Sequence, residues 1–298
     1  MKVNTGVAGQ TFENGERKVI NLYIEGDYEN SVDKHVLESI FEGHFKEVAI
    51  DYKTMGFCTN VIAASEVLYK ENKNNYFIID RDHHDDSTVN ESWTVKKNNL
   101  IIWKRRHIEN YFLDADFLSQ SQYLKNSITK LKLEQQILNI AKKRLFMDIA
   151  NMVIISIRED MKKKWIECFT NPDEFDTEVN SMEKLLRKHE LECFKSKVNQ
   201  KLSSDYIKDK FYYYKQQFVG EEPTVQFGKG EWLKLMIGKP ILHQIVNSNY
   251  EVRKIDGTNA QGDGKQLKVI KDLFKMNSED KWPEDFRNLK KIVLETII

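Results

Sequence analysis

The sequence predicts an α/β fold in which a mainly parallel sheet is flanked by helices and followed by an added C-terminal helical domain. In the first part of the 298-residue chain, β-rich segments alternate with segments whose apolar residues recur at helical spacing. This alternation is typical of parallel strands joined by right-handed helical crossovers. From about Asp114 onward, Leu, Ile, Lys and Glu recur at helical spacings instead. We therefore expect an N-terminal lead-in over residues 1–17, a sheet-containing domain over 18–118 and a helical domain over 119–298.

Strands and helices alternate in the expected sheet domain. Strands are expected where β-branched, aromatic and other apolar residues cluster: Lys18–Ile24, Lys46–Lys53, Phe77–Ile79 and Leu100–Trp103. Helices are expected where apolar residues recur at helical spacing: Ser31–Phe41 and Thr59–Asn72. The apolar run that leads into Asp80 is typical of a strand buried on both faces of a parallel sheet. The residues from there to Lys97 are mostly polar, which predicts a loop.

The second half of the chain carries helical patterns almost throughout, with an interruption at Pro172. The expected helices are Leu131–Phe146, Ala150–Phe169, Glu178–Lys201, Ser204–Phe218, Gly228–Ile237, Pro240–Val246, Gln266–Lys275 and Glu284–Ile297. A loop that contains Gly and Asn is expected over Asn247–Gly264.

Composition restricts the classes of partner and the cellular compartment. Lys plus Arg and Asp plus Glu both number 46, so bulk electrostatics predict neither a nucleic-acid nor a membrane partner without a local patch. The longest apolar runs are far shorter than a membrane span, and the N-terminus lacks the apolar core of a signal peptide. Cys58, Cys168 and Cys193 are scattered without metal-binding spacing, which is typical of a reducing compartment. We therefore expect a cytoplasmic protein.

Acidic residues follow two of the expected strands at the point where each strand ends. Asp80 and Asp82 follow Phe77–Ile79, and Glu25 follows Lys18–Ile24. The carboxyl ends of parallel strands share one edge of the sheet, where α/β folds bind their ligands. Because side chains alternate along a strand, Asp80 and Asp82 point the same way if the strand continues that far. Neighbouring carboxylates repel unless a cation or a proton lies between them, and their oxygen atoms favour Mg²⁺ or Mn²⁺.

These acids support a catalytic interpretation and a simpler alternative. Mg²⁺ held by Glu25, Asp80 and Asp82 can polarise a phosphodiester, activate water and neutralise the leaving oxygen. Glu25 is either a metal ligand or a general acid/base. Alternatively, residues 80–86 form only a solvated, charged loop and Glu25 lies in a polar turn. The matching positions of the acids at two strand ends favour the metal site.

Three motifs occur in an order found in Toprim domains: IEGDYENSVD (Ile24–Asp33), IIDRD (Ile78–Asp82) and KRRHIENYF (Lys104–Phe112). The first two resemble the Glu-Gly and aspartate-pair motifs of a Toprim domain. The third resembles a signature of the overcoming-lysogenization-defect-like Toprim nucleases. Within that group, the chain most resembles the Toprim effectors of PARIS-type anti-phage defence systems. The resemblance covers about residues 18–118, and it implies a Toprim-type sheet.

The resemblance implies roles for particular residues. Glu25, Asp80 and Asp82 carry over as the catalytic and metal-binding acids, with Mg²⁺ or alternatively Mn²⁺ as cofactor. Glu109 is similar in place to the Glu-Asn of the third motif and is implied either as a further metal ligand or as a residue that orients the site. The alternative for Glu109 is a helix N-terminal residue that interacts with the helix dipole.

The resemblance also implies a function. The chain is expected to be a Mg²⁺-dependent nuclease and a toxin of abortive infection, which cleaves host tRNA when an ABC-type ATPase partner releases it. A homodimer is expected because nucleases that cut both strands commonly pair their active sites. Alternatives are a DNA endonuclease of the same fold and a catalytically idle module that only binds the ATPase. A haloacid-dehalogenase-like phosphatase also carries an aspartate pair after a strand, but it would have a small or β-branched residue where His83 and His84 stand.

Other motifs have both a functional and a simpler interpretation. A basic cluster that either contacts phosphates or forms a solvated helix entry lies at the edge of the expected site: Lys104, Arg105, Arg106 and His107. His83 and His84 are interpreted as solvated residues of an acidic loop, with metal binding or proton transfer as the alternative. The aromatic run Phe211–Tyr214 resembles a stacking platform for bases, but packing in the helical core is favoured.

Overall fold

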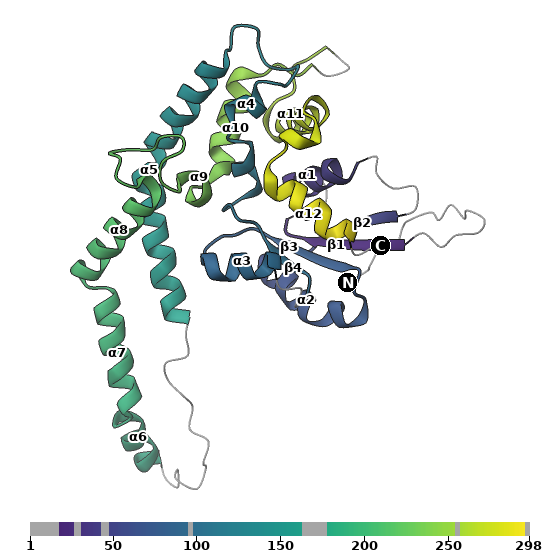
Figure 1. The fold of residues 1–298 in the computed structure, drawn as a ribbon. Helices are drawn as coiled ribbons and strands as arrows, with labels where there is room; N and C mark the ends of the chain where they lie inside the picture. The colour runs from purple at the N-terminus through teal and green to yellow at the C-terminus, as the bar shows by residue number, and fades with distance from the viewer. Residues whose placement is uncertain are drawn as a thin grey trace.

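The computed structural model describes residues 18–26, 31–42, 48–94, 98–162, 178–253 and 257–295. The expected lead-in over residues 1–17 lies outside these ranges. Figure 1 shows a body in which the sheet lies beside the C-terminal helices, with a long helical arm on one side.

The strands are β1 (Lys18–Ile24), β2 (Val48–Thr54), β3 (Asn75–Ile79) and β4 (Leu100–Ile102). They form a four-stranded sheet in the order β2-β1-β3-β4. All neighbouring pairs are parallel, which confirms the expected α/β class. In the register, Ile24 of β1 lies opposite Thr54 on one side and Ile78 on the other. The chain therefore leaves β1 and β3 at the same edge of the sheet.

Helices cover both faces of the sheet, and they are α1 (Val32–Phe41), α2 (Cys58–Glu71) and α3 (Asp86–Thr94). Ile78 belongs to the core on the α1 side. Its neighbours Phe77 and Ile79 pack with Val61 of α2 on the opposite side. Every residue of β3 is buried, so the expectation of a strand buried on both faces is confirmed.

The polar loop expected after β3 is wrong over Asp86–Thr94, where α3 forms. The carboxylate of Asp85 accepts a hydrogen bond from the Thr88 amide at 2.8 Å, which caps the start of this helix. The Trp93 indole N–H donates to the Ile102 carbonyl at 2.6 Å and attaches the helix to β4. Because α3 is polar over most of its surface, it carries too few apolar residues for a helical period to be visible.

The remainder of the described chain is mainly helical, as expected. Its elements are η1 (Ile108–Phe112), α4 (Ala115–Leu118), α5 (Lys130–Lys162), α6 (Glu178–Leu186), α7 (His189–Lys201), α8 (Ser204–Val219), α9 (Trp232–Leu235), α10 (Gly238–Asn249), α11 (Gly262–Met276), η3 (Glu279–Lys281) and α12 (Glu284–Glu295).

Several helix boundaries differ from the expected ones. The helices expected over 131–146 and 150–169 form one continuous helix, α5, as far as the described residues extend. The helix expected over 178–201 is divided into α6 and α7. The loop expected over 247–264 is shorter, because α10 continues to Asn249 and α11 begins at Gly262.

The sheet and the helical region share one apolar core. Helices α11 and α12 pack against α1, and α10 packs against both α11 and η1. The ring of Phe112 in η1 lies 6.1 Å from that of Phe274 on α11 and 5.9 Å from that of Phe286 on α12. This packing holds η1 and α10 beside the sheet. The expected domain boundary after residue 118 stays a prediction, and the core continues across it.

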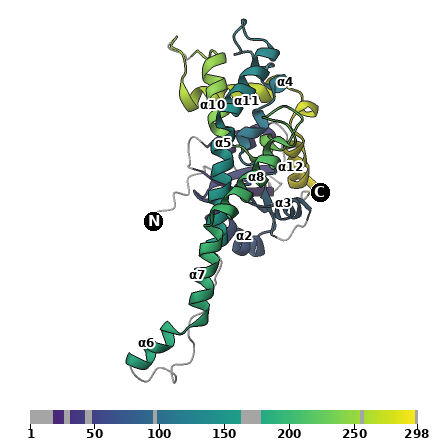
Figure 2. The same ribbon diagram turned by 90° about the vertical axis from the view of Figure 1, so that its left-hand side faces the viewer.

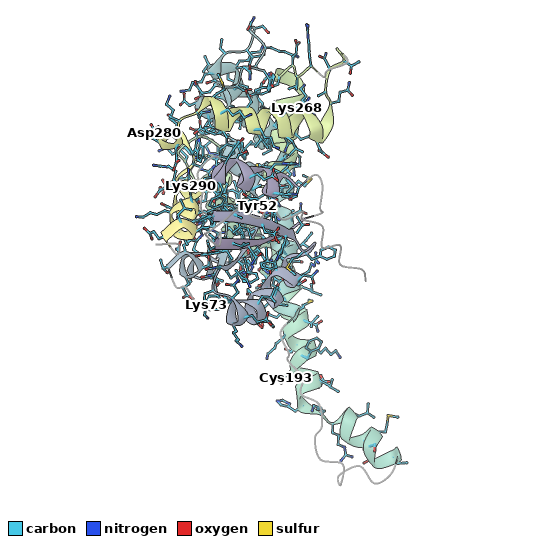
Figure 3. All side chains as sticks on the ribbon, turned by 90° about the vertical axis from the view of Figure 1, so that its right-hand side faces the viewer. Tyr52, Lys73, Cys193, Lys268, Asp280 and Lys290 are labelled. Atoms are coloured by element: carbon cyan, nitrogen blue, oxygen red, sulfur yellow. The ribbon has the colours of Figure 1, made fainter. Side chains whose placement is uncertain are left out.

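A helical arm extends from the body. Helix α8 lies against α5, and Figure 2 shows α7 and α6 continuing away from the sheet. Figure 3 places Cys193 on this arm, at a distance from Tyr52 of the sheet. Cys168 lies outside the described residues. Within the described ranges, no helix combines the length and the apolar character that crossing a membrane requires.

Candidate metal centre

Two carboxyl groups meet where β1 and β3 end. Glu25 directly follows β1, and Asp80 directly follows β3. The backbone N–H of Asp80 donates a hydrogen bond to Glu25 Oε1 at 2.8 Å. The parallel register thus brings these two sequence-predicted residues into direct contact.

Gly26 turns the chain out of β1 beside Glu25. It has a φ of 98°, and it exchanges backbone hydrogen bonds of 2.9 and 3.3 Å with Gly56. A Cβ at this position would lie 2.9 Å from Ser31 Oγ. Glycine therefore allows Ser31, the N-cap of α1, to approach the end of β1. As a result, Asp33 in the first turn of α1 lies close to the acids of the sheet edge.

Asp82 reaches the same region by a different path from the expected one. Strand β3 ends at Ile79, and Asp82 has a positive φ of 43°, so strand alternation does not extend to it. A carboxylate oxygen of Asp82, one of Glu25 and the Sγ of Cys58 nevertheless lie within 4.8 Å of one another. A left-handed turn therefore brings Asp82 to Glu25, where the sequence suggested a continued strand.

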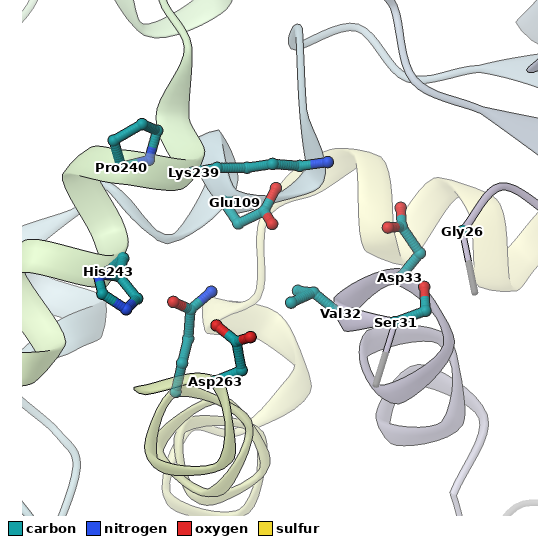
Figure 4. A pocket seen from close by; sticks show the side chains of 10 residues that line it. Gly26, Ser31, Val32, Asp33, Glu109, Lys239, Pro240, His243 and Asp263 are labelled. Atoms are coloured by element: carbon teal, nitrogen blue, oxygen red, sulfur yellow. The ribbon is translucent and has the colours of Figure 1, made fainter. Parts of the chain in front are cut away.

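A cavity of about 400 Å³ adjoins these acids, with Asp33, Glu109 and Lys239 among the residues that line it. Figure 4 shows the side chains of these three residues, from α1, η1 and α10, directed toward a common space. The Nζ of Lys239 lies 3.8 Å from Asp80 Oδ2. The sheet edge and the helical region therefore both contribute to one charged site.

Close packing of α10 on η1 positions Lys239. The side-chain amide of Asn110 donates hydrogen bonds to the carbonyls of Leu233 at 3.0 Å and Met236 at 2.8 Å. A Cβ at Gly238 would overlap Asn110 Oδ1, so only glycine allows α10 to begin this close to η1. This contact holds Lys239 in the first turn of α10, on the same cavity wall as Glu109.

Two buried carboxylate oxygens of this cluster have no hydrogen-bond partner among the described residues: Asp80 Oδ1 and Glu109 Oε2. Asp80 is only 7% exposed and Glu109 only 3%. A buried carboxylate loses its hydration, and proteins normally replace it with hydrogen bonds. These two oxygens would therefore be satisfied by a water molecule, a proton or a cation.

Burial and mutual repulsion raise the pKa values of the acids. Burial raises the pKa of Glu25 to about 7, although the hydrogen bond from the Asp80 amide opposes this shift. Burial and the charge of Asp33 raise the pKa of Glu109 to about 7. The pKa of Asp80 is raised well above its usual range, chiefly by burial and then by Asp33. Burial lowers the pKa of Lys239, but the surrounding carboxylates outweigh this effect and raise it.

The donor set fits a divalent cation. Glu25 and Asp82, together with Cys58, offer donor atoms within 4.8 Å of one another, close enough to share one ion. The other two sequence-predicted acids, Asp80 and Glu109, lie beside Lys239 and form no such group among the described residues. Their oxygen atoms are hard ligands of the kind preferred by Mg²⁺ and Mn²⁺, and the two oxygens without partners mark where coordination is most needed. The Sγ of Cys58 is a softer donor, which Mg²⁺ does not favour.

The first half of the expected basic cluster makes internal contacts. The Nζ of Lys104 lies 2.9 Å from Asp285 Oδ1. The guanidinium of Arg105 donates to the Asn110 carbonyl at 2.7 Å. These side chains attach η1 and α12 to the end of β4.

In the second half of the basic cluster, Arg106 is buried and His107 is half-buried. Arg106 donates to the Leu235 carbonyl at 3.2 Å. Burial, together with the positive charges of Lys239 and Arg106, lowers the pKa of His107 to about 3, so His107 is neutral at pH 7. A phosphate-binding role for the four residues of the cluster stays a prediction, and the observed contacts are those of residues that support η1.

The two histidines after the aspartate pair are held in the structure. The rings of His83 and His84 stack with centroids 5.2 Å apart. His83 Nε2 lies 3.3 Å from Glu159 Oε2 of α5. Burial lowers the pKa of His84. Through His83, the loop after β3 therefore contacts α5, and the His83 side chain also remains partly exposed to solvent.

The sequence interpretation missed Asp33, Lys239 and Cys58. Asp33 belongs to the segment after Glu25, and an acid in the first turn of a helix that follows a strand end was a detectable signal. Lys239 lies between Gly238 and Pro240, and nothing local connects that segment with the sheet edge. Cys58 is adjacent to Glu25 and Asp82 only through the packing of α2.

Comparisons of this chain with protein-family models, with curated proteins and with solved structures found no match. The chemistry of the site therefore follows from its own residues. A cluster of this composition can bind a divalent cation and, through that cation and Lys239, attract an anionic substrate.

Proposed function

We propose that the chain is a metal-dependent phosphodiesterase, acting as a nuclease through a Toprim-type site at the carboxyl edge of its sheet. One observation carries the proposal: a group of acids converges on one lysine, and two of their buried oxygens have no partner among the described residues. The acids whose charges act on Lys239 are Glu25, Asp33, Asp80 and Glu109, and Asp82 lies beside Glu25.

The charges of the cluster require a counter-ion. Carboxylates this close cannot all ionise unless cations or protons compensate them. Lys239 supplies a single positive charge, and the raised pKa values of Glu25, Asp80 and Glu109 mean that protons compensate part of the remaining charge in the metal-free protein. Glu25 and Asp82 are close enough to hold a divalent cation together, and we propose Asp80 and Glu109 as its further ligands. The buried carboxylates of Asp272 and Asp285, by contrast, are hydrogen-bonded.

The chain's own residues have distinct parts in phosphodiester hydrolysis. A bound divalent cation would polarise a phosphoryl oxygen and lower the pKa of a bound water. Lys239 provides a fixed positive charge for a non-bridging phosphate oxygen. The Asp80 N–H holds Glu25 through its Oε1, so that its Oε2 is left to exchange a proton with a reacting group. Gly26 has no side chain that would collide with Ser31, so α1 and its Asp33 can approach Glu25.

The substrate and the biological setting are proposed from the sequence resemblance alone. By that resemblance, the enzyme is an abortive-infection toxin of the cytoplasm that cleaves host tRNA, is restrained by an ABC-type ATPase and acts as a homodimer. A restrained enzyme is compatible with zero net charge, because freely scanning nucleic-acid enzymes usually carry a positive surface.

Expression in cells tests the proposal. Growth and total-RNA integrity are measured for the wild type, Glu25→Ala and the double variant Asp80→Ala/Asp82→Ala. The control is Asp51→Asn, which changes an acid of β2 that pairs with Lys53 at 3.4 Å on the surface. We expect growth arrest with discrete tRNA fragments in the wild type and the control, and neither effect in the two site variants.

The other outcomes of the same experiment are informative. Broken plasmid or chromosomal DNA with intact tRNA would keep the site but change the substrate to DNA. Equal toxicity of all four proteins would contradict a catalytic role for the acids. If the wild type is silent, the same four proteins are compared after purification, with added Mg²⁺.

A further inference from the structure

A second cavity, of about 240 Å³, lies between the loop after β3 and helix α8 of the arm. Asp82 and His84 line it from the loop, and Lys210, Tyr213 and Tyr214 line it from α8. Asp82 also belongs to the metal centre through its proximity to Glu25. The second cavity and the acid cluster therefore share Asp82.

The aromatic run of α8 is divided between the core and this cavity. Phe211 and Tyr214 pack against the core. Tyr213 is 53% exposed, and its ring meets that of Tyr214 edge-on, with centroids 5.2 Å apart. Tyr212 is 65% exposed and is not among the residues that line the cavity. The expectation that this run belongs to the core is therefore incomplete, because Tyr213 offers a ring to the cavity.

Most of the acidic groups that line this cavity have partners. Asp86 pairs with Arg81 at 2.7 Å and also contacts Lys234. Lys234 lies 3.2 Å from Glu231 as well. The Asp85 carboxylate caps the start of α3. Asp82 thus remains as an acceptor in the cavity that no cation among these lining residues compensates.

Positive charge lies at the arm side of the cavity. The Nζ of Lys210 is 5.7 Å from the centroid of the Tyr213 ring. An exposed aromatic ring with an adjacent cation is the combination by which proteins bind unpaired bases, since the ring stacks on the base and the cation attracts the phosphate. If one Asp82 oxygen holds the cation, the other oxygen would suit an amino group on the edge of a base.

We propose that this cavity binds one unpaired nucleobase of the substrate, stacked on Tyr213, beside the phosphodiester at the metal centre. The proposal rests on the proposed nuclease function and adds the part of the substrate that is recognised. RNA loops and single-stranded DNA both present unpaired bases, so the shared feature is the base itself. Fully paired duplex would not enter the cavity.

Binding of short oligonucleotides tests this proposal. The affinity of the full chain for 5′-labelled eight-nucleotide single strands is measured by fluorescence anisotropy in Ca²⁺, with RNA and DNA in separate titrations. A blunt hairpin duplex of matched composition is the paired probe. Cleavage of the same probes in Mg²⁺ is followed in parallel on gels.

The variants are chosen to separate stacking from other effects. Tyr213→Ala is expected to weaken single-strand binding about 10-fold, the size typical of losing one base–aromatic stack. Tyr213→Phe keeps the ring, and Tyr212→Ala alters the adjacent exposed tyrosine outside the cavity. Both are expected to bind within about 2-fold of the wild type, because Tyr213→Phe retains the stacking ring and Tyr212 lies outside the cavity. If the affinity for only one of RNA and DNA depends on Tyr213, that nucleic acid is the source of the base.

Failure of this proposal can be distinguished from failure of the nuclease function. Unchanged single-strand binding by Tyr213→Ala would overturn the base site even if Mg²⁺-dependent cleavage is observed. Absence of binding to every single strand, or an equal loss for the duplex, would overturn it too. Tyr213-dependent binding without any Mg²⁺-dependent cleavage would support the base site and contradict the nuclease function.

Discussion

Asp272 on α11 and Asp80 at the end of β3 are buried to a similar degree, at 4% and 7% exposure, but their surroundings differ. Asp272 accepts hydrogen bonds from the Ser121 hydroxyl at 2.6 Å, from the Gln122 backbone N–H at 2.9 Å and from the Gln122 side-chain amide. Asp80 has one oxygen without a partner among the described residues and another 3.8 Å from the Nζ of Lys239.

The difference between these two aspartates indicates which acid stabilises the fold and which acid is available for a ligand. Asp285 follows the pattern of Asp272, because it accepts from the Tyr111 hydroxyl at 2.6 Å and pairs with Lys104. Glu109 follows the pattern of Asp80. The buried carboxylates of Asp272 and Asp285 in the helical region therefore have hydrogen-bond partners, whereas Asp80 and Glu109 at the carboxyl edge of the sheet each have an oxygen without a partner among the described residues.

Metal binding is expected to produce the largest change in stability. Mg²⁺ or Mn²⁺ at 100 times its dissociation constant should raise the free energy of unfolding by about 2.7 kcal/mol relative to EDTA, since it binds only the folded state. The double variant Asp80→Asn/Glu109→Gln should lose this increase, and Asp272→Asn should retain it. Urea unfolding followed by circular dichroism gives the values. An equal increase in all three proteins would place the metal elsewhere.

Exchange of Asp272 or Asp80 for asparagine is expected to have different effects on the free energy of unfolding. In EDTA, Asp272→Asn should lower the free energy of unfolding by about 2 kcal/mol, because its amide nitrogen would face the Ser121 and Gln122 donors. Asp80→Asn should not lower it, because the substitution removes one of several like charges. The same urea titrations measure both. Equal destabilisation by the two substitutions would show that Asp80 is a structural residue.

The metal-free protein is expected to lose stability as pH rises. Burial raises the pKa of Glu25 and of Glu109 from an ordinary 4.5 to about 7, so the folded state binds more protons than the unfolded state between those values. The free energy of unfolding must then fall with rising pH across this window. Urea midpoints between pH 5 and pH 8 in EDTA measure it, and Glu25→Gln should make the decrease shallower. Stability that rises with pH over this range would contradict the raised pKa values.

The smallest expected effect is on the salt dependence of nucleic-acid binding, and it should differ between Lys239 and Lys104. If Lys239 contacts a phosphate, Lys239→Met should reduce the slope of log affinity against log salt by about 0.7 for a single-stranded RNA. Lys104→Met should leave that slope unchanged, because Lys104 is paired with Asp285. Anisotropy titrations over a range of KCl concentrations give both slopes. A reduced slope for Lys104→Met instead would support the basic cluster expected from the sequence.

The positions of Glu25 and Asp80 could be predicted because apolar strands end at charged residues and parallel strands share an edge. Asp82 was expected to point the same way as Asp80 only if the strand continued that far, and this condition is not met. Strand alternation stops at Ile79, and a left-handed turn brings Asp82 to Glu25. Periodicity describes a strand well, but it carries no information about the turn that follows.

Lys239 and α3 illustrate what periodicity could not reveal. Lys239 joins the acids only because Gly238 lets α10 pack against Asn110, a contact between segments far apart in the sequence. Helix α3 is mainly polar, and individual contacts such as the Trp93 hydrogen bond attach it to the sheet. The cluster from Lys104 to His107 shows its charge in the sequence but not its internal contacts, which depend on α12 and α9.

Cleavage by the purified full chain tests the proposed metal centre most directly. Structured RNA and plasmid DNA are incubated with the wild type in Mg²⁺ and in EDTA, and with Asp80→Asn and Asp272→Asn in Mg²⁺. We expect cleavage of nucleic acid by the wild type in Mg²⁺ and none in EDTA. Asp80→Asn should be at least about 100-fold slower, since a metal ligand supplies several kcal/mol of charge stabilisation, while Asp272→Asn should keep the wild-type rate. Cleavage that persists in EDTA and in Asp80→Asn, or no cleavage by a wild type that also fails to bind Mg²⁺ and Mn²⁺, would contradict a metal-dependent phosphodiesterase.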